Sequence, residues 1–245
     1  MNSSLCDEHE FLYRLVTMWK VMLECHRIQC QAISEAKALD SIATGSKLDD
    51  TRLSAIVDLE LELLRWTGNF ASWISAQKNY VKALNGWLVL CLHYEPEVTD
   101  DGVVPYSPGR IGAPLVFVIC NYWSQAVDRI SEVEVINAMQ TFTTNLRHLW
   151  EQHGVDPHHK MTLNGDMDRL VRAREREAQI IHKEVDVLNR KLVFVSGQND
   201  LPGHSAEVSS LQLGLKQIFE AMENFTANSL KSYEELRMRS EEESG

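Results

Sequence analysis

The chain has few residues that interrupt helices and no excess of positive charge. It contains 6 prolines and 12 glycines among 245 residues, so long stretches run without a helix breaker. Its formal net charge is -11, whereas proteins that hold nucleic acid through its phosphates need clustered Lys and Arg. We therefore expect few, long helices and no nucleic-acid partner.

Cysteines are also few, and they do not form the pattern of a secreted disulfide framework. The five lie in apolar periodic segments, as Cys6, Cys25, Cys30, Cys91 and Cys120. We interpret them as reduced, buried thiols of a nuclear or cytoplasmic protein. The first residues lack the basic and apolar regions of a signal peptide, and no run approaches about 18 uncharged apolar residues. Asn2 stands where N-myristoylation requires glycine, so the sequence predicts neither secretion nor a membrane anchor at this end.

Two long helices, joined as a hairpin, are predicted for residues 1–94. Over residues 7–43, one helical stripe with alternating spacings of three and four holds Leu12, Val16, Trp19, Leu23, His26, Cys30 and Ile33. A second stripe keeps the same spacing over about 60 Å of helix. Its members are Ile56, Leu59, Leu63, Trp66, Phe70, Trp73, Gln77, Tyr80, Leu84, Trp87 and Cys91. We interpret the three tryptophans as core anchors rather than a ligand-stacking surface, and expect Asp49 or Asp50 to cap this helix.

A proline-rich loop is predicted for residues 95–114, and buried helices for residues 115–154. Four of the 6 prolines fall in the loop, where the backbone cannot continue as helix. The following apolar run, residues 115–130, is rich in β-branched side chains, but no partner strand is evident and we assign it to a buried helix. Ser131 and Glu134 fit a capping box that opens a further helix, which ends near Gly154.

The C-terminal part is predicted to be a coiled-coil hairpin at residues 168–240, after a polar linker at 155–167. The apolar positions of its first arm are Val171, Arg174, Ala178, Ile181, Val185, Leu188, Leu192 and Val195. Those of the second arm are Leu211, Leu215, Ile218, Met222, Phe225, Ser229 and Leu236. The expected fold is a single all-α domain spanning residues 1–245. It would be an elongated bundle of about six long antiparallel helices with coiled-coil-like packing.

Two pairings of the C-terminal heptads fit the pattern, one within a chain and one between two copies. Arg174 and Ala178 interrupt the apolar seam near its start, and closing a loop of about 15 residues costs less than joining two chains. We therefore expect a monomer, whose mass of 28.0 kDa stays constant on dilution.

Four segments closely resemble a plant-specific family of domains of unknown function. They read YRLVTMWKVMLECH, LELELLRWTGNFASWISAQKNYVKALNGWL, PYSPGRIGAPLVFVICNYWSQAVDRISE and FEAMENFTANSLKSYEELRMRSEE. The family includes the nitrate regulatory gene two proteins, the altered phosphate starvation response protein and the rolled and erect leaf proteins. The resemblance covers nearly the whole chain.

This resemblance implies a regulatory protein of nutrient signalling or of leaf and root development, with no known catalytic residues. It also implies a bZIP-like label, locations at the nucleus and the plasma membrane, and an N-terminal lipidated domain in full-length members. We expect this chain to correspond to the C-terminal domain or to a shortened paralogue, in the nucleus or cytoplasm. Any membrane partner would then be reached through the missing N-terminal domain.

The bZIP-like label requires a basic region ahead of the heptads that begin at Ile181. The only candidate consists of Arg169, Arg172, Arg174 and Arg176. Glu175 and Glu177 stand among these arginines and would repel phosphates. A solvated helix face with internal ion pairs explains the same residues better.

Three groups of Cys and His residues invite a test for metal binding, but none has the paired short spacings of a structural site. The groups are Cys25, His26 and Cys30; Cys91 and His93; and His153, His158 and His159. We expect no metal, no cofactor and no catalytic residue, and interpret His26 as a histidine of the core stripe.

The candidate partner or switch site is the loop that holds Pro105, Tyr106, Ser107, Pro108 and Arg110. Ser107 offers a phosphorylatable hydroxyl beside the cation of Arg110. A rigid connection between helices explains the same residues, so both interpretations stay open. We expect a non-enzymatic scaffold or coregulator that binds other proteins, among them transcription regulators. The rival is a peripheral membrane-binding module, which would need a continuous basic face.

Overall fold

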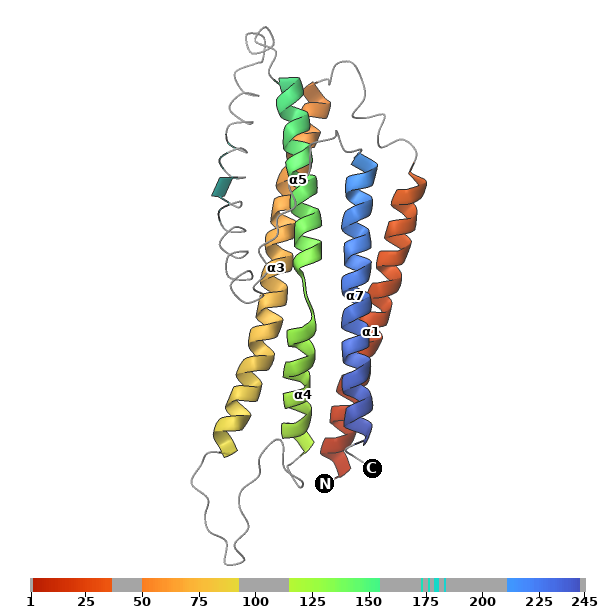
Figure 1. Ribbon diagram of the computed structural model, residues 1–245, viewed down its shortest axis with the longest axis vertical. Coiled ribbons are helices and arrows are strands. Elements are labelled where there is room, and N and C mark those ends of the chain that lie inside the picture. Colours follow the sequence, from red (N-terminus) through yellow and green to blue (C-terminus); the bar gives the residue numbers. More distant parts are fainter. Residues whose placement is uncertain are drawn as a thin grey trace, which may run out of the picture. The chain divides into compact units, whose positions relative to one another are not determined.

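The structure, a computed structural model, describes residues 2–36, 50–92, 115–154 and 211–242, together with five single positions between 173 and 183. Its helices are α1 (Asn2–Glu35), α3 (Asp50–Leu92), α4 (Leu115–Arg129), α5 (Val133–Gly154) and α7 (Leu211–Glu242) (Figure 1). These described residues contain no strand. The all-α class predicted from the sequence is therefore confirmed.

Five helices are described where about six were expected. The expected sixth falls on residues 168–195, of which only the five single positions are described, all of them helical. The loop at 95–114, the linker at 155–167 and most of the first coiled-coil arm also lie outside the described residues, and their predictions stay predictions. The elongated form and the coiled-coil packing likewise stay predictions.

The chain forms two compact units, and three helices contribute to both. Unit 1 contains Met1–His26, Ile74–Ser131 and Glu223–Gly245, and unit 2 contains Arg27–Trp73 and Glu132–Met222. Parts of α1, α3 and α7 therefore combine with α4 in unit 1 and with α5 in unit 2. The expectation of one domain over residues 1–245 stays a prediction.

Helix α1 buries the stripe that its sequence predicts. Leu12, Val16, Trp19 and Leu23 are buried, and the later members of the stripe, from His26 onward, are half-buried. The helix ends at Glu35, where the Ala36 N–H donates to the Ile33 carbonyl at 3.2 Å, and so it stops short of the predicted end near residue 43. Within unit 1, α1 runs antiparallel to α7, since its start and the end of α7 lie together (Figure 1).

Helix α4 confirms the assignment of the apolar run to a buried helix. Its inner face holds Ile119, Cys120, Trp123, Ala126 and Val127. These positions follow the helical spacing of three and four, whereas a strand would have buried alternate residues.

The helix start predicted at Ser131 lies one residue further on. α4 ends at Arg129 and α5 begins at Val133. The Ile136 N–H donates to the Glu132 carbonyl at 3.1 Å, which makes Glu132, and not Ser131, the residue before the first helical position. The predicted capping box of Ser131 and Glu134 is therefore wrong, because its spacing of three residues no longer fits the helix start. α5 ends at Gly154, as expected.

The stripe predicted for α7 is confirmed. Its buried members are Leu211, Ile218, Met222, Phe225, Ser229 and Leu236, and Leu215 is half-buried. The helix spans Leu211–Glu242, and it also buries Tyr233, which the sequence analysis did not single out.

Helix α3 begins at Asp50, where the sequence predicts a helix start, but its predicted stripe is wrong over much of its length. One row of α3 consists of residues spaced seven apart, and all of its members are buried. We call it the inner row, and its members are Glu60, Thr67, Ile74, Val81 and Leu88. A neighbouring row, which we call the outer row, consists of Leu59, Trp66, Trp73, Tyr80 and Trp87. Trp66 is half-buried, and the other four members of the outer row are exposed.

The tryptophans of α3 are consequently not the core anchors that were expected. Trp73 is 40% exposed and Trp87 is 62% exposed, while Trp66 is half-buried and lies 6.3 Å from the Phe219 ring. Among the stripe members whose side chains the structure describes, only Ile56, Leu63 and Phe70 are buried. Two neighbouring rows of α3 both show the coiled-coil spacing, and hydrophobicity alone favoured the aromatic one.

Candidate functional site

The loop chosen from the sequence as a partner or switch site lies outside the described residues. This applies to Pro105, Tyr106, Ser107, Pro108 and Arg110. Of the arginines weighed as a basic region, only Arg176 is described, and it is exposed on a helical position. The sequence-based candidates therefore stay predictions.

Three cysteines have side chains that the structure describes. None of the three forms a disulfide bond, and their environments differ. Cys120 is buried, Cys30 is half-buried and Cys25 is exposed. The expectation of buried thiols is therefore wrong for Cys25. This residue directly precedes His26, the last member of the α1 stripe that belongs to unit 1. Among the described residues, the structure shows no group of three or more His, Cys, Asp or Glu side chains that could hold a metal ion.

In unit 1, three helices meet at the hydroxyl of Tyr233. The Tyr233 side chain is fully buried on α7, and its Oη accepts hydrogen bonds from Gln77 Nε2 of α3 at 2.9 Å and from Trp123 Nε1 of α4 at 3.2 Å. Its ring stacks on Trp19 of α1 with 5.7 Å between centroids. These directional contacts fix how the four helical segments of unit 1 pack, because each donor reaches the hydroxyl in one register only.

Burial raises the pKa of the Tyr233 hydroxyl above its ordinary value of 10.0. Hydrogen bonds from Trp123, Trp19 and Gln77 oppose this rise, but the loss of hydration is the larger effect. The hydroxyl is therefore neutral at physiological pH. Its role in unit 1 is that of a structural hydrogen-bonding centre.

Unit 2 uses a charged contact between α3 and α5 instead. Arg147 donates from Nε at 2.9 Å and from Nη2 at 2.7 Å to Glu60 Oε1. The Glu60 side chain is 5% exposed and that of Arg147 is 33% exposed, so the cation reaches solvent while the carboxylate is almost fully enclosed. A buried carboxylate needs such a partner, because losing its hydration is otherwise costly.

Unit 2 also contains a close approach between α7 and α5. A Cβ added at Gly214 would lie 2.2 Å from Cδ2 of Phe142. Phe142 is 2% exposed, so its ring has no free space into which it can turn. A side chain at position 214 would therefore force the Phe142 ring to shift.

The clearest surface feature of unit 1 is an exposed seam on α3. Its members alternate by four and three and are Ala76, Tyr80, Ala83, Trp87 and Leu90, all of them exposed. Tyr80 is 63% exposed, Trp87 is 62% exposed and Leu90 is 71% exposed. We call these five residues the α3 seam. Such a seam normally faces another helix, since large apolar side chains at heptad spacing are the signature of helix pairing.

The α3 seam rests on the core through Tyr80. The Tyr80 ring meets the edge of the buried Trp123 ring with 6.3 Å between centroids, and Phe11 of α1 meets the same indole at 5.6 Å. Phe11 is 47% exposed, so an apolar side chain of α1 also reaches the surface beside this indole. The exposed rings of Tyr80 and Phe11 are thus both packed against the buried Trp123 ring.

On α3 itself, the charged residues around the seam are few and all basic. No Asp or Glu occurs between positions 63 and 92 in a chain whose net charge is -11. Lys82 of this stretch is paired with Asp128 of α4 at 2.9 Å. Sequence reasoning selected Tyr80 and Trp87 but assigned them to the core, and it missed that an alanine precedes each of them along the seam.

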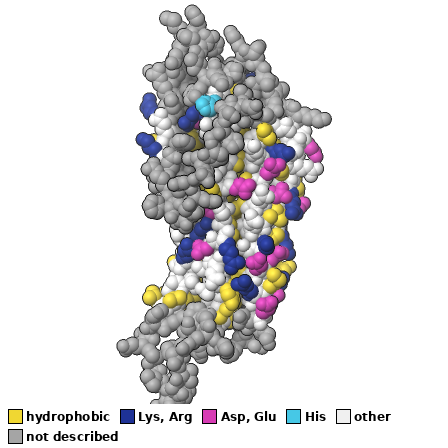
Figure 2. All heavy atoms as spheres, in the orientation of Figure 1, with side chains coloured by type: hydrophobic (Ala, Val, Ile, Leu, Met, Phe, Trp, Pro, Cys, Tyr) yellow, Lys and Arg dark blue, Asp and Glu magenta, His cyan; other side chains and the backbone are white. Residues whose placement is uncertain are grey.

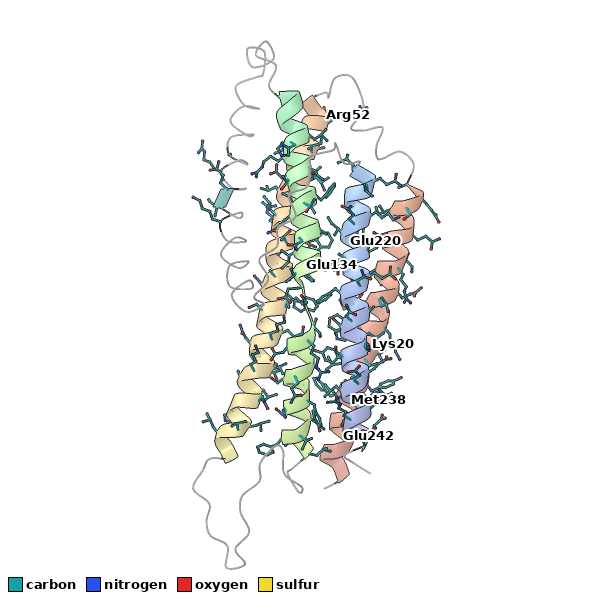
Figure 3. The ribbon with its side chains drawn as sticks, viewed as in Figure 1. Lys20, Arg52, Glu134, Glu220, Met238 and Glu242 are labelled. Carbon is teal, nitrogen blue, oxygen red and sulfur yellow. The ribbon has the colours of Figure 1, made fainter. Side chains whose placement is uncertain are left out.

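None of the described helices is sufficiently long and apolar to cross a membrane. In unit 1, charged side chains pair across helices, as Lys20 on α1 (labelled in Figure 3) does with Glu234 on α7 at 3.0 Å. Arg129 at the end of α4 lies 3.6 Å from Glu235 in the same way. On the described part of the face in Figure 2, basic and acidic side chains are interspersed.

Comparison with known protein families gives one match over more than half of the chain. The matching family is described as a protein of unknown function (DUF632), and the match covers residues 9–148. This range includes nearly all of α1, the whole of α3 and α4, and most of α5. No solved structure matches the chain.

Two curated relatives come from plants. The protein Altered Phosphate Starvation Response 1 of Arabidopsis thaliana is 23% identical over 254 residues, covering 93% of this chain and 38% of the relative. The protein Rolling and Erect Leaf 2 of Oryza sativa subsp. japonica is 27% identical over 133 residues, covering 54% of this chain and 17% of the relative. The chain thus spans less than two fifths of the length of either relative.

Proposed function

This chain belongs to the DUF632 family, and we propose that it is a non-enzymatic helical module that binds other proteins as a scaffold or coregulator. The setting we propose is plant nutrient or developmental signalling. The names of the two relatives refer to a response to phosphate starvation and to leaf form, which supports a regulatory role. Neither name denotes an enzymatic reaction.

The observation that carries the proposal is the number of large apolar side chains on the outside of described helices. In unit 1, α1 exposes Phe11, Met18 and Val21, while α3 exposes Tyr80 and Trp87. Single exposed apolar residues are common, but rows at helical spacing are typical of surfaces that pack against other helices. A chain that buries a well-formed core and still exposes such rows is suited to binding partners.

Contacts between helices within each unit also support the proposal, because they would hold the exposed rows in fixed positions. The contacts of Tyr233 in unit 1 and of Glu60 with Arg147 in unit 2 join helices at defined registers. These contacts support packing as a helical bundle, which would present the exposed rows as rigid surfaces. Rigid surfaces lose less conformational entropy on binding than mobile ones.

A peripheral membrane-binding module is the second candidate, because α3 combines exposed aromatic residues with an acid-free stretch. Aromatic and basic side chains together favour the membrane interface. However, binding to anionic lipid needs several clustered cations, and Lys82 already pairs with Asp128. The interspersed charges in Figure 2 likewise favour a protein partner over a lipid surface.

We propose a nuclear or cytoplasmic location, with proteins of transcriptional regulation among the partners. Proximity labelling in plant tissue, with this chain as bait, tests the proposal. We expect enrichment of regulatory proteins, and a loss of part of this set with Val21→Glu, which puts a charge on a side chain of α1 that is 59% exposed. Met238 of α7 (Figure 3) is 48% exposed, and Met238→Glu is the matched control that should leave the set unchanged.

Two results would contradict the proposal. One is a labelled set that does not differ from that of an unrelated helical bait. The other is cosedimentation of the purified chain with vesicles of phosphatidylserine and phosphatidylcholine at physiological salt, without any enriched protein. The second result would favour the membrane-binding candidate.

A further inference from the structure

We infer that the α3 seam pairs with the same seam of a second copy of this chain, antiparallel and about a twofold axis. This inference concerns a different surface from the C-terminal heptads, for which a monomer was expected. It goes beyond the proposed scaffold function, which does not depend on it.

The order of large and small residues along the seam carries the inference. The seam reads Ala76, Tyr80, Ala83, Trp87 and Leu90, so that an alanine precedes each of its two aromatic residues. In an antiparallel pair of identical helices with its axis between positions 80 and 83, Tyr80 faces Ala83 of the second copy. Trp87 then faces Ala76 of the second copy.

This register fits every aromatic ring of the seam over an alanine. Large side chains that face small ones let two helices approach closely without strain. Any twofold interface repeats each contact twice, so one sequence must contain both the large residue and the gap that receives it. The α3 seam meets this condition at Tyr80 and Trp87. In the same register Leu90 falls opposite Trp73 of the second copy, which is 40% exposed.

The positions that flank the seam carry no charge. In heptad terms, Gln77 and Leu84 flank it on one side, and Asn79 and Gly86 on the other. Charged residues at these positions normally select a different partner or exclude a second copy. Their absence here leaves the self-pairing unopposed, and nothing lies within 4 Å of a Cβ added at Gly86, so the flank has open space.

The lysines of this stretch do not face one another in the pair. Lys78 and Lys82 lie at the heptad positions furthest from the seam, and Lys82 is neutralised by Asp128. The remaining electrostatic term is the repulsion between two chains of net charge -11, which salt screens. Pairing should therefore strengthen as salt is raised.

The size of the surface predicts a weak dimer. From Ala76 to Leu90 the seam is about 21 Å long at 1.5 Å per residue. Stable interfaces bury about 800 Å² on each partner, and one helix of this length provides less. We expect reversible pairing with a dissociation constant of about 10 to 100 µM. Phe11, which meets the same Trp123 indole as Tyr80, lies at the edge of this surface.

Sedimentation equilibrium of the purified chain from about 1 to 300 µM tests the inference. The mass should rise from 28.0 kDa toward twice that value, and the midpoint should shift to lower concentration in high salt. Trp87→Glu should weaken pairing at least tenfold, since it brings a charge onto each side of the interface. Met238→Glu, an equally drastic change at an exposed apolar residue of α7, should leave pairing unchanged. Circular dichroism of each variant checks that the fold is retained.

A variant with a larger side chain separates the possible occupants of the seam. Ala83→Trp fills the gap that receives Tyr80 of the second copy, so it should also weaken pairing at least tenfold. On a lipid surface the same change would add an interfacial tryptophan and strengthen binding to phosphatidylserine vesicles.

The inference is overturned by a constant mass of 28.0 kDa up to about 300 µM, or by a dimer that Trp87→Glu and Ala83→Trp leave unaffected. Vesicle binding that Trp87→Glu abolishes and Ala83→Trp enhances would assign the seam to a membrane and would equally overturn it. A failed inference leaves the protein partners found by proximity labelling untouched, so the two proposals are tested separately.

Discussion

Two rows of α3 run side by side with the same heptad spacing and opposite environments. The inner row, from Glu60 to Leu88, contains a carboxylate and a hydroxyl and is buried throughout. The outer row, from Leu59 to Trp87, consists of apolar and aromatic side chains and is exposed except at Trp66, which is half-buried. The more hydrophobic row is thus the one that faces outward.

The two polar members of the inner row are buried because their polar atoms find partners within the chain. Glu60 is enclosed because Arg147 of α5 reaches its carboxylate, and Thr67 is enclosed because its hydroxyl donates to the Leu63 carbonyl at 2.7 Å. With its polar atoms satisfied, the inner row packs as a core row does. The outer row remains available for a partner outside the chain.

The largest expected effect is a loss of stability, compared between one residue of the inner row and one of the outer row. Ile74, in the inner row, is 1% exposed, and Ile74→Ala should lower the free energy of unfolding by about 2 to 5 kcal/mol. Trp87→Ala removes more apolar atoms, but its ring is mostly in water, so the loss should stay below about 0.5 kcal/mol. Urea denaturation at about 1 µM protein measures both values while self-pairing is negligible. The reverse order would show that the rows are interchanged.

The next effect concerns the charged member of the inner row. Glu60→Ala should destabilise unit 2 by about 2 to 3 kcal/mol. This is less than the loss of about 3 to 5 kcal/mol that is usual for a broken buried pair, because Arg147 keeps partial access to water. Glu62 on the same helix is the control. It pairs with Arg65 at the surface, and Glu62→Ala should change stability by less than about 0.5 kcal/mol. Equal losses of unfolding free energy in the two variants would show that the contact with Arg147 is not what stabilises the buried Glu60.

Two glycines offer a matched pair of smaller effects. Gly214→Ala should destabilise by about 1 to 3 kcal/mol, because the new Cβ meets the Phe142 ring. Gly86, beside the outer row, has nothing within 4 Å of an added Cβ. Gly86→Ala should therefore stabilise α3 by about 0.5 to 1 kcal/mol, the usual gain of alanine over glycine within a helix. Thermal unfolding of both variants gives the signs, and a destabilising Gly86→Ala would mean that this side of α3 is covered.

The last effect depends on pH and concerns the hydrogen bonds that Gln77 and Trp123 donate to Tyr233. Tyr233→Phe leaves the donors of Gln77 and Trp123 without their acceptor, which should cost about 1 to 2 kcal/mol at pH 7. Because burial raises the pKa of Tyr233, the unfolded chain loses this proton first, near pH 10.0. The wild-type contribution is thus complete below pH 10.0 and declines above it. Urea denaturation between pH 8 and 11 should show a steeper decline for the wild type than for Tyr233→Phe, and parallel curves would contradict it.

Helices with a single apolar stripe could be predicted from the sequence. α1 and α7 each offer one such stripe, and its residues are the ones that the structure buries, from Leu12 to Leu23 and from Leu211 to Leu236. α4 was assigned correctly because its apolar run had no possible partner strand. Helix existence and type thus follow from local patterning.

The face of α3 could not be predicted, because two of its rows satisfy the same pattern. The contact of Glu60 with Arg147, 87 residues apart, allows the one carboxylate of the inner row to be buried, and no local signal contains that contact. The start of α5 after Glu132 was missed because Ser131, one residue earlier, is the better capping residue by type. Tyr80 and Trp87 of the candidate site were identified from the sequence, but they were predicted to be core residues.

The solvent accessibility of individual tryptophans in unit 1 tests the central claim most directly. Hydroxyl-radical footprinting at about 1 µM, read by mass spectrometry, compares Trp87 of the outer row with the buried Trp19 and Trp123. We expect rapid oxidation of Trp87 and strong protection of Trp19 and Trp123. Protection of Trp87 equal to that of Trp19 at this dilution would contradict the claim that the aromatic row of α3 faces outward.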